Sequence, residues 1–266
     1  MADTVFRSFT DGNESGPTIV FVHGWPDDHT LWDKQVAHLK DRFRCVTVDL
    51  PGFSSDANHE VVSKWGYSFE ELAKRLERTI EAVGDGKPVY LVTHDWGCFY
   101  GYIMEQARPG LVKKMVAMDV GGGLSLGPSL SLLCIATYQI FLVTAFLIGG
   151  PIGDFMARRF ARLVGAPSAS SVARASACYP YFHFWKAQIR SCFRMGSYTP
   201  RCPVLFMYGT MGAKKLMSFH ADWWADKIRK KEGSSVVELT EATHWLMLDP
   251  GANVVNAQLD VFFAEE

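Results

Sequence analysis

A carboxylate occupies an unusual position in the sequence Thr93-His94-Asp95-Trp96-Gly97. Asp95 follows an apolar, strand-like run, and a second largely apolar segment begins after Gly97. A sharp turn from a strand into a helix exposes one side chain at its tip and requires small neighbours, a requirement that Gly97 meets. An ionised carboxylate at such a tip can attack an sp³ carbon and form an ester, although an Asp at a helix start also serves as an ordinary N-cap. Asp95 is therefore a candidate nucleophile with a structural alternative.

Two other segments place reactive groups where they could reach this corner. The sequence FVHGWPDDH (21–29) follows a strand-like run, so the backbone N–H of Trp25 can face the same end of a sheet. In TEATHWLML (240–248), His244 lies in a loop after the last expected strand. A lone histidine is usually structural, but one paired with an upstream corner carboxylate is a candidate general base.

Short β-like runs alternate with longer helix-like runs along most of the chain. We expect strands at 18–24, 44–52, 88–94, 113–119, 203–209 and 234–239, and helices at 67–84, 97–107 and 253–265. Ser68 and Glu71 form a capping box at the start of the first helix. The alternation predicts an α/β fold with a mostly parallel central sheet flanked by helices. In such sheets sites form beyond the carboxyl ends of the strands, which is where Asp95 lies.

The alternation of strands and helices is interrupted between residues 121 and 200, where the chain reads as helices and loops without strands. We interpret this stretch as an inserted helical lid between two sheet strands. The predicted organisation is therefore a core built from residues 1–120 and 201–266, with the lid at 121–200 between its two parts.

The beginning of the lid is strongly apolar. No charged residue and no histidine occurs from Val120 to Gly153, and SLLCIATYQIFLVTAFLIGG (131–150) is long enough to span a membrane. Ser, Thr and Gln recur through it, and it is the only such segment. We expect a buried or amphipathic helix over an apolar cavity and no bilayer span. Peripheral membrane contact without spanning is the alternative.

The bulk composition limits the classes of protein to consider. The chain has 266 residues, 48% hydrophobic and 21% charged, which suits one large domain or a domain with an insertion. A formal net charge of −1 without a basic run argues against a nucleic-acid partner. The six cysteines lack CxxC spacing and the N-terminus lacks an apolar signal region, so we expect reduced thiols in a cytoplasmic protein, with membrane association through the lid as the alternative. No cofactor and no metal is expected, and the oligomeric state is left open.

With these motifs in place, the sequence resembles the α/β-hydrolase superfamily and, within it, the branch of epoxide hydrolases and haloalkane dehalogenases. The resemblance rests on His-Asp-Trp-Gly at 94–97, on His-Gly-X-Pro at 23–26 and on the lid. It implies the α/β-hydrolase fold with an inserted cap and an Asp95 nucleophile that forms an alkyl ester. It also implies that His244 activates water to hydrolyse this ester, while the N–H groups of Trp25 and Trp96 form the oxyanion hole. His23, Gly24 and Pro26 are expected in the substrate-binding loop.

The leaving atom distinguishes the two branches of this family. An epoxide oxygen becomes an alkoxide and needs an acid, which two cap tyrosines supply in epoxide hydrolases. Tyr138 in TYQIF (137–141) is the first candidate, Tyr181 in CYPYFHFWK (178–186) is the second, and Tyr179 is its fallback. Trp25 at the X of His-Gly-X-Pro also resembles the epoxide hydrolases. Aromatic packing within the cap remains the alternative for each tyrosine.

The acid that should orient His244 is missing from its usual place. That place is MYGTMGAKK (207–215), where Gly212 stands instead, and no Asp or Glu occurs between Pro203 and Ala221. Asp119 ends the strand before the lid, a position that some dehalogenase relatives use. We predict an Asp119 oxygen within about 2.6–3.2 Å of His244 Nδ1, although Asp119 could simply cap a strand end.

The leading hypothesis is an epoxide hydrolase acting on a small apolar epoxide and water. A haloalkane dehalogenase is an alternative. An inactive hydrolase-fold protein that binds an apolar ligand or partner is a third reading, favoured by the missing acid and by the apolar lid, and another enzyme of the same fold is a fourth.

Overall fold

The computed structural model describes residues 4–56, 60–123, 130–168, 171–191, 197–212, 217–248 and 250–264. Seven strands form one sheet in the order β1-β3-β2-β4-β5-β6-β7, and only the edge strand β1 runs antiparallel to its neighbour. The strands are β1 (Arg7–Gly12), β2 (Thr18–Val22), β3 (Arg44–Asp49), β4 (Val89–His94), β5 (Val112–Met118), β6 (Val204–Gly209) and β7 (Ser235–Leu239). The predicted α/β fold with a mostly parallel sheet is confirmed.

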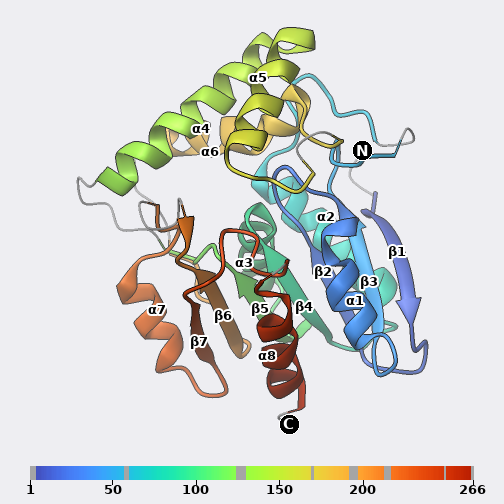
Figure 1. Cartoon of the computed structure of the whole chain (residues 1–266). Coiled ribbons are helices and arrows are strands. Elements are labelled where there is room, and N and C mark those ends of the chain that lie inside the picture. The colour runs from blue at the N-terminus through green and yellow to red at the C-terminus, as the bar shows by residue number, and fades with distance from the viewer. Residues whose placement is uncertain are drawn as a thin grey trace.

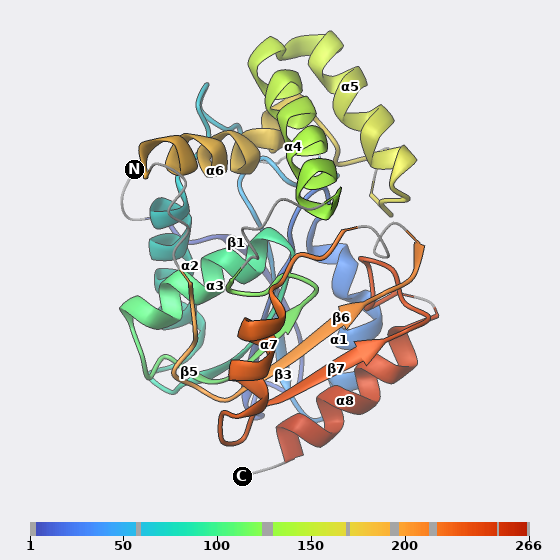
Figure 2. The same cartoon turned by 90° about the vertical axis from the view of Figure 1, so that its left-hand side faces the viewer.

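Helices cover both faces of this sheet. Figures 1 and 2 show α1 and α8 on one face and α2 and α3 on the other, with α7 beside β6 and β7. Their bounds are α1 (Asp33–Leu39), α2 (Phe69–Val83), α3 (Trp96–Ala107), α7 (Asp222–Arg229) and α8 (Ala252–Ala264), and a short 3-10 helix η1 covers His29–Trp32. The capping box predicted at Ser68 and Glu71 is present at the start of α2. Strand β1 and helices α1 and α7 were not among the elements predicted from the sequence.

The insertion between β5 and β6 folds as helices at one end of the molecule (Figure 1). They are α4 (Leu130–Ile148), α5 (Gly150–Leu163), the 3-10 helix η2 (Ala175–Cys178) and α6 (Tyr179–Arg190). This is where the sequence predicted a lid, and the helices lie beyond the carboxyl ends of the strands. By length and composition alone α4 could cross a membrane, with a mean hydropathy of 2.1, but a buried core helix can pass the same test.

One side of α4 packs inward. Its buried residues are Ile135, Gln139, Leu142 and Ala145, and 28% of its most apolar window is buried. The helix therefore covers the end of the sheet, as expected, but most of its surface does not face the protein.

The described cysteines are free thiols. Cys45, Cys98, Cys178 and Cys202 are buried and Cys134 is half-buried, whereas Cys192 lies outside the described residues. Four buried thiols agree with the expectation of reduced cysteines. The cytoplasmic location inferred from them stays a prediction.

Candidate active site

Asp95 lies at the tip of a strained turn between β4 and α3. Its φ of 50° and ψ of −123° are rare for a residue with a side chain. Gly97 permits the turn, because a Cβ there would lie 2.5 Å from the carbonyl oxygen of Val22. The strained turn thus places the Asp95 carboxylate beyond the end of the sheet, as the sequence predicted.

The loop after β2 brings a backbone donor to this carboxylate. Strands β2 and β4 are parallel neighbours at the point where the strand order reverses, so their carboxyl ends lie side by side. The N–H of Trp25 donates to Asp95 Oδ1 at 2.8 Å, and the N–H of Trp96 also faces the carboxylate. Gly24 makes the approach possible, since a Cβ at this position would lie 2.3 Å from Asp95 Oδ1. Both predicted oxyanion-hole donors therefore point at one carboxyl group.

Asp119 and His244 meet across the same rim of the sheet. His244 Nδ1 lies 2.5 Å from Asp119 Oδ2, and His244 Nε2 lies 3.6 Å from Asp95 Oδ2. The side chain of Asp119 is fully buried, and its Oδ1 accepts from the N–H of Gly209 at 3.2 Å. The predicted contact between Asp119 and His244 is present, slightly shorter than expected. The imidazole therefore lies between two carboxylates.

This arrangement shifts the pKa values of the three groups. Burial alone lowers the pKa of His244, but the charge of Asp119, the hydrogen bond to it and the proximity of Asp95 raise the pKa to about 9. Burial raises the pKa of Asp95, yet the hydrogen bond and charge of His244 lower it overall. In the free protein at neutral pH, Asp95 is therefore ionised beside an imidazolium.

Two further contacts hold the loop that carries His244. The buried His94 donates from Nε2 to the carbonyl oxygen of His244 at 2.9 Å, and Trp245 donates from Nε1 to Asp27 Oδ2 at 2.7 Å. Burial lowers the pKa of His94 to about 3 and raises that of Asp27 to about 7. His94 is therefore a neutral structural donor, and both contacts fix the position of His244.

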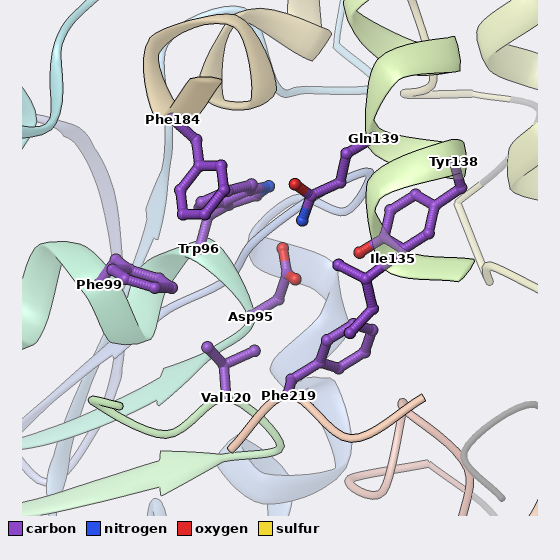
Figure 3. Close-up of a pocket in the computed structure, with 9 residues that line it drawn as sticks. All are labelled: Asp95, Trp96, Phe99, Val120, Ile135, Tyr138, Gln139, Phe184 and Phe219. Carbon is purple, nitrogen blue, oxygen red and sulfur yellow. The ribbon is translucent and has the colours of Figure 1, made fainter. Parts of the chain in front are cut away.

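Two cavities open on Asp95 beneath the lid, and both are lined by Asp95, Tyr138 and Phe219. The larger measures about 490 Å³ and extends past Trp25 and Tyr181. The smaller measures about 30 Å³ on the side of Trp96. Figure 3 shows the Asp95 carboxylate pointing towards the Tyr138 hydroxyl and the Gln139 amide, with Phe184 and Trp96 across the cavity. The reactive carboxylate thus faces a mainly apolar space.

The two predicted cap tyrosines both line the larger cavity, and their rings contact each other. Tyr138 comes from α4 and Tyr181 from α6, with ring centroids 6.1 Å apart at a steep angle. The Tyr181 ring also contacts Trp25 and Trp96, at 5.7 and 5.0 Å between centroids. Burial raises the pKa of both tyrosines, so both hydroxyls stay protonated and able to donate.

Four residues that were predicted to bind substrate do not line either of the two described cavities. His23 is fully buried, donates from Nδ1 to Gly24 O at 2.9 Å and accepts from the N–H of Leu50 at 3.0 Å. Gly24 and Pro26, which follows a cis peptide bond, shape the same loop without lining either cavity. The motif that these residues form holds the backbone of the loop that carries the Trp25 N–H.

The fourth is Tyr179, the fallback for Tyr181. Its hydroxyl donates to Pro51 O at 3.2 Å, and its fully buried ring packs against Phe53 and Gly66. Tyr179 therefore joins the lid to the core and points away from the cavities. Position 180 is proline at the start of α6, and the two tyrosines around it leave the helix on different sides.

Several lining residues were missed by the sequence analysis. Gln139, which had no predicted role within TYQIF (137–141), is 7% exposed and lines the smaller cavity. Phe160 and Phe219 line the larger cavity from α5 and from the loop before α7. No local signal distinguishes these two from packing residues. Among the described residues, no group of three His, Cys, Asp or Glu side chains is arranged to hold a metal ion.

Residues 19–257 match the model of the alpha/beta hydrolase family. A 115-residue segment is 38% identical to "Probable oxidoreductase EphD" of Mycobacterium tuberculosis and covers 43% of this chain and 19% of that protein. A 109-residue segment is 34% identical to "Epoxide hydrolase 3" of Mus musculus and covers 41% of this chain and 29% of that protein. The alignments thus span less than a third of the length of these relatives.

Solved structures extend the likeness over nearly the whole chain. The epoxide hydrolase of Bacillus megaterium, solved with an inhibitor, superposes with a TM-score of 0.70 over 98% of this chain and 97% of that one, at 21% identity. At this level of identity the superposition shows a shared fold.

Proposed function

Because the chain belongs to the alpha/beta hydrolase family, we propose that it is an epoxide hydrolase that converts a small apolar epoxide and water into a vicinal diol. The observation that carries the proposal is the placement of Asp95, at a strained corner, between His244 and two tyrosines across an apolar cavity. The segments shared with epoxide hydrolases and the common fold give further support.

The first proposed step forms an ester on Asp95. The ionised carboxylate needs no base, and its lowered pKa keeps it ionised. One carboxylate oxygen attacks an epoxide carbon, the C–O bond of the ring breaks, and the electron pair moves to the epoxide oxygen. The hydroxyls of Tyr138 and Tyr181 donate to this oxygen and supply its proton. The oxygen stays on the neighbouring carbon of the esterified substrate, as the first hydroxyl of the diol.

The second proposed step hydrolyses that ester. In the free protein the negative charge of Asp95 helps to raise the pKa of His244. Forming the ester removes this charge, so the pKa of His244 falls. The imidazole then loses its proton more readily, and its Nε2 accepts a proton from an attacking water while Nδ1 stays bound to Asp119.

The oxyanion formed at the Asp95 carbonyl accepts from the N–H groups of Trp25 and Trp96. A single donor of this kind is typically worth about 3 kcal/mol. The carbonyl then reforms as the ester C–O bond breaks, and the proton on Nε2 passes to the departing oxygen, which becomes the second hydroxyl of the diol. The proton that the imidazole lost before the attack of water restores the tyrosine hydroxyl used in the first step, and Asp95 returns its own proton to His244.

Asp119 also bears on the competing interpretation as an inactive binding protein. That interpretation rested partly on the absence of an acid for His244. The contact between Asp119 and His244 supports catalysis, because it offers an acid in the order nucleophile, acid, base. The apolar lid remains as the other feature that prompted the binding hypothesis.

The direct test is product release from an aryl epoxide, a fatty epoxide and a bromoalkane, each with the parent and with Asp95→Ala. Diol from the epoxides alone, lost in Asp95→Ala, is the expected result. Bromide release would instead assign a dehalogenase. No turnover together with tight retention of one of these compounds would assign a binding protein.

A further inference from the structure

The outer surface of the lid carries an uncovered apolar face on α4. Leu133, Thr137, Ile140, Thr144 and Leu147 follow one another at intervals of four or three residues, so they share one side of the helix. Leu133, Ile140 and Leu147 are 64%, 52% and 58% exposed. A contiguous apolar stripe on the outside of a protein is typical of surfaces that contact another protein or a membrane.

The two threonines on this face do not interrupt its apolar character. Thr137 donates from Oγ1 to the carbonyl oxygen of Leu133 at 2.8 Å, and Thr144 donates in the same way to Ile140 at 2.9 Å. Both hydroxyls are satisfied within the helix, so neither must give up a hydrogen bond to water when the face enters an apolar environment.

Helix α5 packs against α4 and carries a second exposed face that includes positive charge. Ile152 and Phe155 are 66% and 65% exposed, and Arg159 and Arg162 are exposed on the following turns. Positions 152, 155, 159 and 162 again follow helical spacing. Apolar side chains next to arginines are typical of helices that lie in the interface of an anionic membrane.

The charge of the whole lid is consistent with the same partner. Residues 121–200 contain seven Lys or Arg and one Asp, whereas the whole chain has a formal net charge of −1. The lid therefore carries +6, and the rest of the chain carries −7. Such an asymmetry orients the lid towards a negatively charged surface and the core away from it.

From this face and this charge we propose that α4 and α5 dock onto the surface of an anionic phospholipid bilayer. The opposite side of α4 argues against a transmembrane span, because Ile135 and Gln139 on that side line the cavity at Asp95. If the partner were another protein, its interface would have a polar rim around an apolar centre, and this rim would need polar groups on α4 to pair with. The α4 face offers only apolar groups and hydroxyls that are already bonded.

The position of the cavity mouth gives the docking a consequence, which rests on the proposed function. Leu163, at the end of α5, is 81% exposed and also lines the larger cavity. Met211, at 43% exposure, lines it from the other side. A docked lid would place this apolar mouth near the lipid, so that an epoxide dissolved in the bilayer could enter without crossing water.

Docking can be measured without any catalytic readout. Purified full-length protein is sedimented with vesicles of phosphatidylcholine alone and of phosphatidylcholine mixed with phosphatidylglycerol, without detergent. We expect binding to the mixed vesicles that weakens with added salt. Ile140→Asp combined with Leu147→Asp should weaken binding at least about tenfold for each lost side chain. Arg159→Gln should weaken binding to the mixed vesicles about fivefold and leave binding to phosphatidylcholine vesicles unchanged.

Two matched proteins control the measurement. Val261→Asp places the same charge at a 59% exposed valine on α8, far from the lid (Figure 1), and should bind like the parent. Asp95→Ala should also bind like the parent, which separates docking from catalysis. The proposal is overturned if the parent does not bind mixed vesicles or if the Ile140→Asp/Leu147→Asp variant binds them as well as the parent. It is also overturned if Val261→Asp weakens binding as much as the lid variant does. It is equally overturned if the lid substitutions only convert a dimer into monomers.

Discussion

Asp119 Oδ2 and His244 Nδ1 lie 2.5 Å apart, although 125 residues separate them in the sequence. Asp119 reaches this position through a φ of 69°, in the left-handed region, at the end of β5. Its other oxygen is held by the N–H of Gly209 at the end of β6. The carboxylate is thus fixed between two strands before it meets the imidazole, and it holds the nitrogen that faces Asp95 in position.

Asp119→Asn is expected to spare formation of the ester and to slow its hydrolysis by about 10²–10⁴. The reason is that only the second step uses His244 as a base. Trp25 and Trp96 flank Asp95, so stopped-flow tryptophan fluorescence in single turnovers can follow both steps. Asp226→Asn, which removes an exposed carboxylate paired with Arg229 on α7, is the control. Equal slowing of both steps would speak against this role for Asp119.

Tyr138→Phe and Tyr181→Phe are each expected to slow ester formation from epoxides by about 10²–10⁴, because each removes an O–H donor and keeps the ring. Tyr179→Phe is the matched control, since its hydroxyl bonds to Pro51 O and points away from the cavity. Ester formation should keep its rate in this control. If all three variants match the parent, the cap tyrosines only pack and the epoxide assignment fails.

Gly24→Ala should lower kcat by roughly 10²–10³, the usual effect of losing one oxyanion donor. A Cβ at residue 24 would lie 2.3 Å from Asp95 Oδ1 and would push the N–H of Trp25 out of place. The measurement is steady-state turnover with a thermal melt to show that the variant is folded. Full activity in a folded variant would contradict the assigned contact.

His244 should make stability depend on pH. Its pKa is raised to about 9 in the folded protein from an ordinary value of 6.5, so the folded state binds the proton more tightly. The resulting stability is fully present below pH 6.5 and is lost as the pH rises through about 9. The expected loss is on the order of 3 kcal/mol. Chemical denaturation of the parent and of His244→Gln, at pH values below 6.5 and above 9, measures the free energy of unfolding. If the free energies of the two proteins changed equally with pH, the prediction would be contradicted.

The sequence was sufficient to predict the elements that position the site. Alternating apolar runs located the six parallel strands and three of the helices, because buried parallel strands and capped amphipathic helices have local signatures. The edge strand β1 was missed, since its residues are mostly exposed and lack such a pattern. Asp95, Trp25 and His244 could be assigned because each follows a recognisable strand. Asp119 was predicted because some dehalogenase relatives use that position and because no Asp or Glu occurs between Pro203 and Ala221.

Contacts that depend on packing could not be predicted. Tyr179 and Tyr181 differ only in the side of α6 from which they leave, and that side is set by Pro51 and Phe53, more than a hundred residues earlier. The apolar composition of α4 likewise does not reveal which of its sides is exposed. His94 and Asp27 hold the His244 loop through contacts that span more than 140 residues, which leave no local trace.

The covalent intermediate on Asp95 is the central claim, and His244→Gln is the variant that should reveal it. Without the base, attack by Asp95 proceeds while hydrolysis stalls, so the ester accumulates. After incubation with an epoxide that the parent converts, mass spectrometry of the digested variant should show the peptide containing Asp95 heavier by the full mass of the substrate. An unmodified Asp95 peptide under the same conditions would contradict the two-step mechanism.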